Sequence, residues 1–325
     1  MTGYMSTADP GQRSRTVVVA LGGNALAPSG ERATITNQFR HARLSVAPLV
    51  ALARDGWRLA IVHGNGPQVG DALVRNELAR DLVEPLPLGV LVAATAGWIG
   101  YMLQQSLQNG LAQAGIDRSV ITVVTQTLVD GDDPRLEQPT KPIGLALTEE
   151  QAEVLIAQGA AVGRDGDGRC RRLAASPVPI GIVEADLVHR LVEDGVIVIA
   201  AGGGGPPVVV RDGCLDGCDA VVDKDRVAAL LARDLEAEAL VILTNVDAVY
   251  RRWGTPEAEP IGTLSVAQAE RLIAEGELDE GGMLPKVEAA LEFVRTGGGR
   301  AIIAHLESGA AALSGRTGTT IQRSL

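Results

Sequence analysis

Residues 17–24 read Val-Val-Val-Ala-Leu-Gly-Gly-Asn, an apolar and mostly β-branched run that ends in two glycines. The same order returns at 58–66, Arg-Leu-Ala-Ile-Val-His-Gly-Asn-Gly, and at 196–205, Val-Ile-Val-Ile-Ala-Ala-Gly-Gly-Gly-Gly. Each run is typical of a buried strand followed by a turn. In parallel sheets ligands bind beyond the carboxyl ends of the strands, where glycine turns let backbone N–H groups approach a ligand closely. Three such turns therefore predict one binding face.

Helical periodicity alternates with strands along the rest of the chain. This alternation predicts an α/β fold, a three-layer α/β/α sandwich around a mostly parallel sheet, with a small inserted subdomain. The further strands are expected at 119–124, 239–243, 300–304 and 319–322. The helices are expected at 35–54, 68–82, within 86–116, at 148–158, from Glu184, and at 224–235, 265–275 and 284–296.

Pattern and composition also predict a domain organisation. Residues 1–15 are polar, without an apolar run, and are interpreted as a disordered tail rather than a signal peptide. An N-terminal lobe is expected over 16–205 and a C-terminal lobe over 206–325. Residues 125–179 are rich in Pro, Gly, Asp and Arg, so we expect an inserted, mobile flap with low local stability.

Composition excludes several classes of protein. With 46% hydrophobic and 21% charged residues, the chain of 325 residues is not intrinsically disordered. A net charge of −11 disfavours nucleic acid as a partner. Three cysteines are too few for a disulfide scaffold. The uncharged stretch 86–116 is long enough to span a bilayer, but its Pro and Gly residues favour a buried or subunit-interface helix. We therefore expect no membrane and a cytoplasmic location.

Lysine is used very differently from arginine. The chain has 26 Arg but only Lys141, Lys224 and Lys286, and each lysine adjoins Pro or Asp. Where Lys persists in such a chain, a compact ammonium group is needed that a planar guanidinium would not replace. Three ammonium groups in an acidic protein predict an anionic ligand, most simply phosphate.

The usual signatures of phosphate chemistry and of other catalysis are absent. No lysine is preceded by Gly as a P-loop requires, and neither His-Arg-Asp nor Asp-Phe-Gly occurs. Gly64-x-Gly66-x-x-x-Gly70 is one residue too long for a dinucleotide fingerprint. His63 fits a general base or, more commonly, a turn histidine satisfied by the backbone. Cys214 and Cys218 lack the spacing of a zinc site, and we expect them to be buried small hydrophobes.

Seven motifs, spread from about residue 16 to 321, resemble the carbamate kinases of the amino-acid kinase family. The most specific is Pro-Thr-Lys141-Pro-Ile-Gly, which lies in the inserted subdomain typical of those enzymes. Two residues depart from the family pattern, Gly282 in place of a usual Ser and Cys170 in place of an aromatic residue. The other motifs are Val-Ala-Leu-Gly-Gly-Asn24-Ala, His-Gly-Asn65-Gly-Pro-Gln68-Val-Gly, Gly-Gly-Gly-Gly205-x-Pro-Val, Val-Asp223-Lys224-Asp225, Leu-Thr244-x-Val-Asp247-x-Val-Tyr250 and Met283-Leu-Pro-Lys286-x-Glu-Ala-Ala.

The resemblance implies a reaction and roles for residues. Carbamate kinases interconvert ATP plus carbamate with ADP plus carbamoyl phosphate, use Mg²⁺, form homodimers and serve arginine metabolism and related degradation pathways. By likeness, the N-terminal lobe binds carbamate or carbamoyl phosphate and the C-terminal lobe the nucleotide, with Mg²⁺ held through ATP and Asp223 near it. The implied catalytic residues are Lys141, Lys224, Lys286, Asp223 and Asp225. The implied substrate-binding residues are Gly22, Gly23, Asn24, Gly64, Asn65, Gly66 and Gln68, of which the glycines and Asn65 supply amides. The implied nucleotide-binding residues are Gly203, Gly204, Thr244, Asp247, Tyr250, Met283 and Lys286.

Three alternatives stay open at this point. A related kinase such as an acetylglutamate kinase would want arginine for its substrate's α-carboxylate, yet no basic residue lies between Arg80 and Arg118. A nucleotide-sensing module of the same fold would not need all three lysines and both aspartates. A dinucleotide-dependent oxidoreductase would need an acidic residue about 20 positions after the first glycine, where Glu84 lies in a Pro-rich turn.

Overall fold

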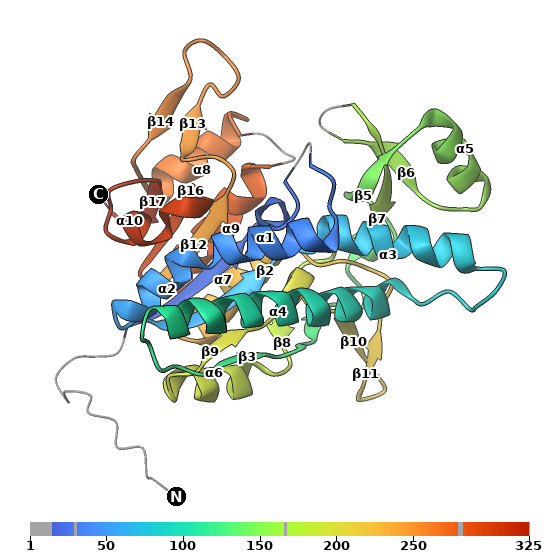
Figure 1. The fold of residues 1–325 in the computed structure, drawn as a ribbon. Helices are drawn as coiled ribbons and strands as arrows, with labels where there is room; N and C mark the ends of the chain where they lie inside the picture. Colours follow the sequence, from blue (N-terminus) through green and yellow to red (C-terminus); the bar gives the residue numbers. More distant parts are fainter. Residues whose placement is uncertain (1–14, 29–30, 166–167, 279–281, 325) are drawn as a thin grey trace, which may run out of the picture.

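The computed structural model describes residues 15–28, 31–165, 168–278 and 282–324. Its centre is an eight-stranded sheet in the order β15-β17-β16-β12-β1-β2-β9-β3 (Figure 1). The strands from β16 to β3 run parallel, whereas β17 is antiparallel to β16 and β15 is parallel to β17. The bounds are β1 Thr16–Leu21, β2 Arg58–His63, β3 Val120–Thr122, β9 Ile197–Ile199, β12 Ala239–Thr244, β15 Thr263–Ser265, β16 Arg300–His305 and β17 Thr319–Gln322.

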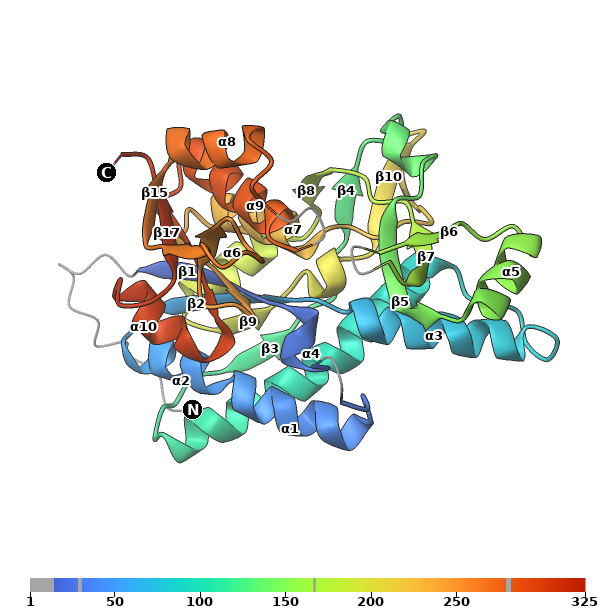
Figure 2. The same ribbon diagram turned by 90° about the horizontal axis from the view of Figure 1, so that it is seen from above.

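Helices cover both faces of this sheet, which confirms the predicted sandwich (Figures 1 and 2). Successive side chains of β1 alternate between two cores: Val17, Val19 and Leu21 pack with α1, α2 and α4, and Val18 and Ala20 pack with α6, α7 and α9. Burial on both faces explains why the strand is continuously apolar. The helices are α1 Ile35–Ser45, α2 Ala47–Arg54, α3 Gly66–Ala79, α4 Leu88–Gln113, α5 Glu149–Ala157, α6 Ala185–Glu193, α7 Lys224–Asp234, α8 Val266–Ala274, α9 Leu284–Arg295 and α10 Gly309–Leu313.

Three smaller sheets complete the fold. A four-stranded sheet has the order β11-β10-β4-β8, a three-stranded sheet the order β5-β7-β6, and β13 pairs with β14. Most of these strands are short and have no clear period, so the sequence did not predict them. Their bounds are β4 Thr127–Val129, β5 Lys141–Leu147, β6 Val162–Arg164, β7 Cys170–Ala174, β8 Pro179–Ile182, β10 Pro207–Arg211, β11 Cys214–Gly217, β13 Val249–Arg251 and β14 Glu259–Ile261.

Two local expectations were wrong. The helix expected over 35–54 is divided at Val46 into two helices. Pro48 causes this division, because it has no N–H to donate to the carbonyl of Leu44 and its ring would clash with that carbonyl in a continuous helix. Cys214 is exposed and Cys218 is partly exposed, since β11 is the outer strand of a projecting hairpin.

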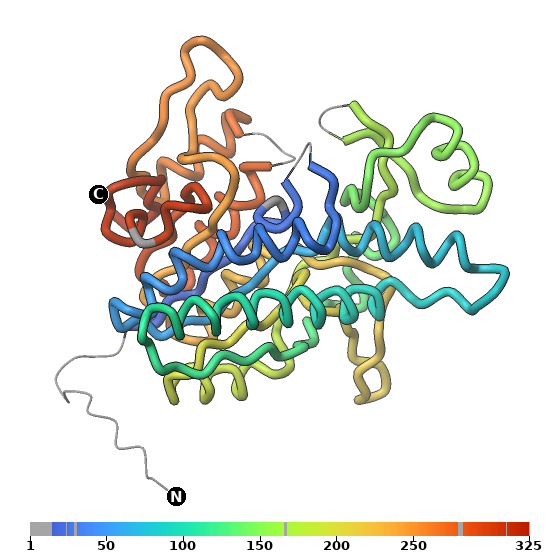
Figure 3. Tube along the Cα trace, in the orientation of Figure 1, coloured from blue at the N-terminus to red at the C-terminus, as the bar shows by residue number. Residues whose placement is uncertain are grey.

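The predicted flap segment is built from two parts. The strands β5, β6 and β7 with α5 form a small unit that we call the flap, residues 141–174 (Figures 1 and 3). The residues before it belong to the body: Thr125 and Thr127 are almost fully buried and bond the backbone of Ala201 and Gly204. The division into lobes at residue 205 stays a prediction, because the eight-stranded sheet includes strands from both sides.

The sequence also made predictions about the N-terminal tail and about the uncharged stretch 86–116. Residues 1–14 of the predicted tail lie outside the described residues, and Arg15 donates to Glu238 at 2.7 Å. The uncharged stretch forms α4, whose inner face is buried against the sheet and α1. None of the helices in the described part of the chain has the length and hydropathy that crossing a membrane requires.

Candidate functional site

A cavity of about 690 Å³ lies at the carboxyl ends of β1, β2 and β12, where the glycine turns were expected to meet. The body, the flap and the C-terminal part of the chain all contribute to its walls, and all three lysines face it. The predicted site residues that line it are Gly22, Gly23, Gly64, Asn65, Gly66, Lys141, Gly203, Asp223, Lys224, Asp225, Thr244, Tyr250, Met283 and Lys286.

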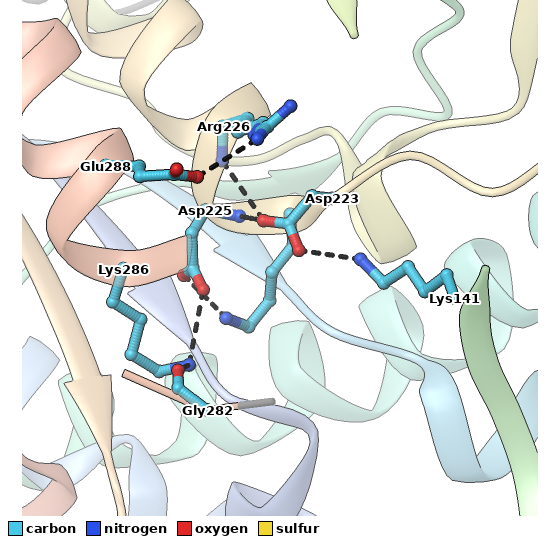
Figure 4. A network of polar contacts seen from close by, with 8 residues as sticks. Lys141, Asp223, Asp225, Arg226, Gly282, Lys286 and Glu288 are labelled. Atoms are coloured by element: carbon cyan, nitrogen blue, oxygen red, sulfur yellow. Dashed lines mark hydrogen bonds and ion pairs between the residues drawn. The ribbon is translucent and has the colours of Figure 1, made fainter. Parts of the chain in front are cut away.

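The flap reaches the body through one ion pair in this cavity. Lys141 is the first residue of β5, and its Nζ donates to Oδ2 of Asp223 at 2.6 Å (Figure 4). Asp223 is the N-cap of α7, where its Oδ1 accepts from the N–H groups of Asp225 and Arg226. The carboxylate of Asp223 therefore caps α7 and also pairs with Lys141 from the flap.

A second carboxylate holds the other two lysines. Asp225 has a side chain only 3% exposed, and its carboxylate lies 3.5 Å from Nζ of Lys286 (Figure 4). The same carboxylate lies 2.6 Å from Nζ of Lys224. Lys286 also donates to the carbonyl oxygen of Gly282 at 2.9 Å. That bond uses the backbone, so the departure of Gly282 from the family Ser does not remove it.

The charges of this network favour an anion. Three ammonium groups face two carboxylates, so one positive charge is left over at the N-terminus of α7, whose helix dipole is also positive there. Burial opposes ionisation of Asp223, but Lys141, Lys224 and the backbone N–H groups outweigh it and hold the pKa of Asp223 well below its usual range. Burial lowers the pKa of Lys286, and Asp225 opposes that change.

The glycine turns approach one another closely at the floor of the cavity. A side chain on Gly64 would lie 3.0 Å from N of Gly23 and 3.2 Å from Cδ of Lys224, so the turn and the lysine need glycine there. The N–H of Gly22 donates to Leu243 and that of Gly64 to Leu21. The expectation that Gly22 and Gly64 supply ligand amides is therefore corrected, since sheet carbonyls already accept those N–H groups.

Other N–H groups in these turns have the geometry that ligand binding needs. Gly23 begins a 3-10 turn, Gly23–Ala25, and Gly66 begins α3. The first N–H groups of a helix have no acceptor within it. We therefore expect the amide donors to be Gly23, Asn65 and Gly66 rather than the whole predicted set.

Three predicted residues with described side chains are not among those that line the cavity. Gln68 is buried and donates to Oε1 of Gln38 at 2.8 Å. Gly204 is buried and its carbonyl accepts from Thr127, while Asp247 accepts from the hydroxyl of Tyr250 at 2.9 Å. Asn24 lies within the 3-10 turn beside Gly23, and its role in substrate binding stays a prediction. His63, the candidate base, is buried, bonds the carbonyl of Gly64 and does not line the cavity, as a structural turn histidine would.

Sequence reasoning missed some residues around the site. Trp253 lines the cavity and its ring lies 5.0 Å from that of Tyr250. Two aromatic residues three positions apart are a usable signal in a chain with 2% aromatics. Thr95 of α4 accepts from the amide of Asn65 at 2.9 Å, and Glu277 lines the cavity. Neither of these two lies in a motif that the sequence would have revealed.

The acidic residues of the site bear on how a metal ion would bind. Within the described ranges, no group of three or more His, Cys, Asp or Glu side chains is arranged to hold a metal ion. The two aspartates of the cavity are each ion-paired with lysine. This arrangement fits a cation that arrives on an anionic ligand better than one held by the protein alone.

Comparison with known proteins gives a consistent result over nearly the whole chain. The model of the amino acid kinase family matches residues 15–305. The carbamate kinase of Pyrococcus horikoshii is 42% identical over 308 residues, 94% of this chain and 98% of the relative. That of Halobacterium salinarum is 46% identical over 309 residues, 94% of this chain and 97% of the relative. The solved carbamate kinase from Giardia lamblia bound to AMP-PNP matches with a TM-score of 0.88 and 34% identity, covering 95% of this chain and 98% of that one.

Proposed function

This chain belongs to the amino acid kinase family, and from that premise we propose how it works as a carbamate kinase. It transfers a phosphoryl group reversibly between ATP and carbamate, giving ADP and carbamoyl phosphate. The observation that carries the site assignment is the convergence of Lys141, Lys224 and Lys286 on Asp223 and Asp225 in one cavity.

The chemistry asks little of the protein beyond position and charge. Carbamate is already an anion, so no general base is needed to form the nucleophile. The remaining tasks are to align attacking and leaving oxygens and to neutralise the charge of the transferred group. The three ammonium groups supply that charge, and the two aspartates orient them before the substrate binds.

The two ends of the cavity would take different parts of the substrates. The glycine turns at Gly23 and Gly66 suit the carbamoyl and phosphoryl oxygens, because free N–H groups of helix starts bind anions. Thr244, Tyr250, Trp253 and Met283 lie on the wall contributed by the C-terminal part of the chain and suit the nucleotide. Lys224 and Lys286 would contact the phosphates between these two ends.

Magnesium would enter with the nucleotide. Asp223 and Asp225 are engaged by lysines, so the described part of the chain offers no separate cage, and the phosphates of ATP or ADP would provide the main ligands. When bound, Mg²⁺ supplies further neutralisation of phosphate charge. The lysines and the helix dipole of α7 do so from the protein side.

A homodimer is also part of the proposal. Large apolar side chains are exposed on three neighbouring helices: Ile35 and Leu44 on α1, Leu78 on α3, and Tyr101 on α4. Large apolar side chains exposed on neighbouring helices are typical of an interface between subunits. The helices lie together on one face of the molecule (Figures 1 and 2).

The related kinases of amino-acid substrates are a weaker alternative. An α-carboxylate would be bound best by a planar guanidinium group. Among the described residues that line the cavity there is no arginine. This favours a substrate as small as carbamate.

The decisive experiment is to mix purified protein with carbamoyl phosphate, ADP and Mg²⁺ and to measure ATP. ATP should form, and acetyl phosphate or N-acetylglutamyl phosphate in place of carbamoyl phosphate should give far less. Folded protein that makes no ATP from carbamoyl phosphate would overturn the proposed function.

A further inference from the structure

Two glycines from two motifs touch where the flap meets the body. Gly70 lies on α3, in the motif that begins at His63, and Gly144 lies on β5 of the flap. A Cβ added to Gly70 would lie 1.9 Å from Cα and 2.8 Å from N of Gly144. These are backbone atoms that cannot rotate away. Neither glycine lines the cavity, so the proposed chemistry gives no reason for them.

The contact is the centre of a larger flap–body junction. Val69 and Leu73 of α3 share a buried apolar cluster with Ile143 and Ala174 of the flap. The guanidinium group of Arg172 in β7 pairs with Glu77 near the end of α3. Figures 1 and 2 both place β5 and β7 along α3. The flap is therefore held along the helix, with backbone against backbone at the two glycines.

The junction lies close to the flap lysine. Lys141 and Gly144 are on the same strand, three residues or about 10 Å apart at the usual rise of a strand. Nζ of Lys141 lies 2.6 Å from Asp223. Ordinary contact for an added methyl begins at 3.4 Å, against the 1.9 Å available here, so the flap or the helix would have to move. A hydrogen bond weakens beyond about 3.2 Å, so a shift of this size would break the pair.

We propose that Gly70 and Gly144 are positioning residues, whose backbone contact places the flap so that Lys141 reaches the phosphoryl site. The proposal rests on the proposed function for its kinetic readout, but the position of the flap can be measured without it. It predicts that Gly70→Ala separates the flap from α3 while leaving the nucleotide wall intact.

The test compares Gly70→Ala with Gly217→Ala, a matched control on β11 where an added Cβ has nothing within 4 Å. For Gly70→Ala, we expect the turnover for ATP formation to fall by ~10-fold or more, towards the ~10²–10³ lost when one charge contact is removed. The Kd for ADP should change by less than about twofold, because the substitution should weaken stabilisation of the transition state and not binding of the nucleotide. The control should match the wild type in both. Unchanged turnover for Gly70→Ala, or a parallel loss of ADP affinity, would overturn the proposal.

A double-mutant cycle separates positioning from a general loss of structure. If Gly70 acts through Lys141, Gly70→Ala added to Lys141→Ala should cost less than about threefold more. Full additivity of the two losses would contradict that pathway. If Gly70→Ala does not fold, Gly144→Ala is used instead, with Gly159→Ala in the same flap as its control. Both glycines have a positive φ (+76 and +85), so alanine strains the backbone at both, but only at Gly144 would the added Cβ lie 3.1 Å from Cα of Gly70, whereas at Gly159 it has nothing within 4 Å. The turnover of Gly144→Ala should fall by less, in the same direction.

Limited trypsin digestion gives a readout that does not depend on activity. Arg171 and Arg172 are partly buried in the junction, and they bond Gly144 and Glu77 respectively. Cleavage after these arginines should be faster in Gly70→Ala than in the wild type or in Gly217→Ala. Equal cleavage rates would overturn the proposal about the flap, whereas a wild-type protein that makes no ATP would instead overturn the proposed function.

Discussion

Nζ of Lys141 lies 2.6 Å from Oδ2 of Asp223, although the two residues are 82 positions apart in the chain. One begins a strand of the flap and the other caps α7. Asp223 has a side chain 21% exposed and Lys141 one 32% exposed, so both can be reached from the cavity. A phosphoryl group that enters the cavity can therefore replace Asp223 as the partner of Lys141 without leaving a deeply buried carboxylate unpaired.

This relationship predicts the effect of removing the flap lysine. Lys141→Ala should lower turnover by ~10²–10³, because one preorganised charge is lost from the transition state. The Kd for ADP should stay nearly unchanged, since Lys224 and Lys286 lie on α7 and α9 and not on the flap. Steady-state kinetics and calorimetric titration with ADP check this. An equal loss of ADP binding would show that Lys141 belongs to the nucleotide site.

The rarity of lysine predicts that arginine will not replace it. Lys224→Arg and Lys286→Arg should each lower turnover by ~10²–10³ with folding intact, because a wider guanidinium would displace the phosphoryl group. Lys224 is closely packed against the glycine turn, because its Cδ would lie only 3.2 Å from a Cβ added to Gly64, so there is little room for a wider side chain. Turnover and circular dichroism are the measurements.

The reverse substitution provides the control. Arg226 follows the lysine–aspartate motif and pairs with Glu288 at 3.0 Å, and it does not line the cavity. Arg226→Lys should keep near-native turnover. If both arginine variants at positions 224 and 286 were also near native, the three-lysine argument would reduce to an accident of composition.

The strands of the main sheet, apart from the three-residue β15, and the lysine cluster could be predicted because their causes are local or compositional. β1 is buried on both faces and so is apolar throughout, and 26 arginines make three lysines conspicuous. Pairing across the chain could not be predicted. The bond from Thr127 to Gly204 joins residues 77 apart. Nor could the sequence show that sheet carbonyls use the N–H groups of Gly22 and Gly64.

Neutralising Asp225 should change the pH dependence of activity. Burial lowers the pKa of Lys286, and the charge of Asp225 opposes this, so in Asp225→Asn the pKa of Lys286 should fall further. A lysine with a lowered pKa loses its proton as pH rises, so the alkaline fall in kcat/KM should begin at a lower pH. The check is a pH–rate profile from neutral to alkaline pH. Asp234→Asn, at the far end of α7, is the control and should keep the native profile.

The exposed apolar side chains predict a dimer that a charge can disrupt. The protein should be a homodimer at micromolar concentration, and Leu44→Glu and Tyr101→Glu should give folded monomers, because a charge is costly to bury in an apolar interface. Leu215→Glu, on the projecting β11, is the matched exposed control and should stay dimeric. Light scattering measures all four, and a monomeric wild-type protein would overturn the prediction.

His63 should make stability fall as pH is lowered. Its ring is buried, and burial lowers its pKa from 6.5 to about 4, although its hydrogen bond to the Gly64 carbonyl opposes this. Between these values the unfolded chain binds a proton that the folded chain does not, so the free energy of unfolding rises with pH across this range. From about pH 7 to about pH 5 the loss should be about 2 kcal/mol. Urea unfolding at one fixed protein concentration should show this loss in the wild type and a smaller one in His63→Asn, even if the variant is less stable throughout. Equal pH slopes for the two proteins would mean that the buried ring accepts a proton without unfolding.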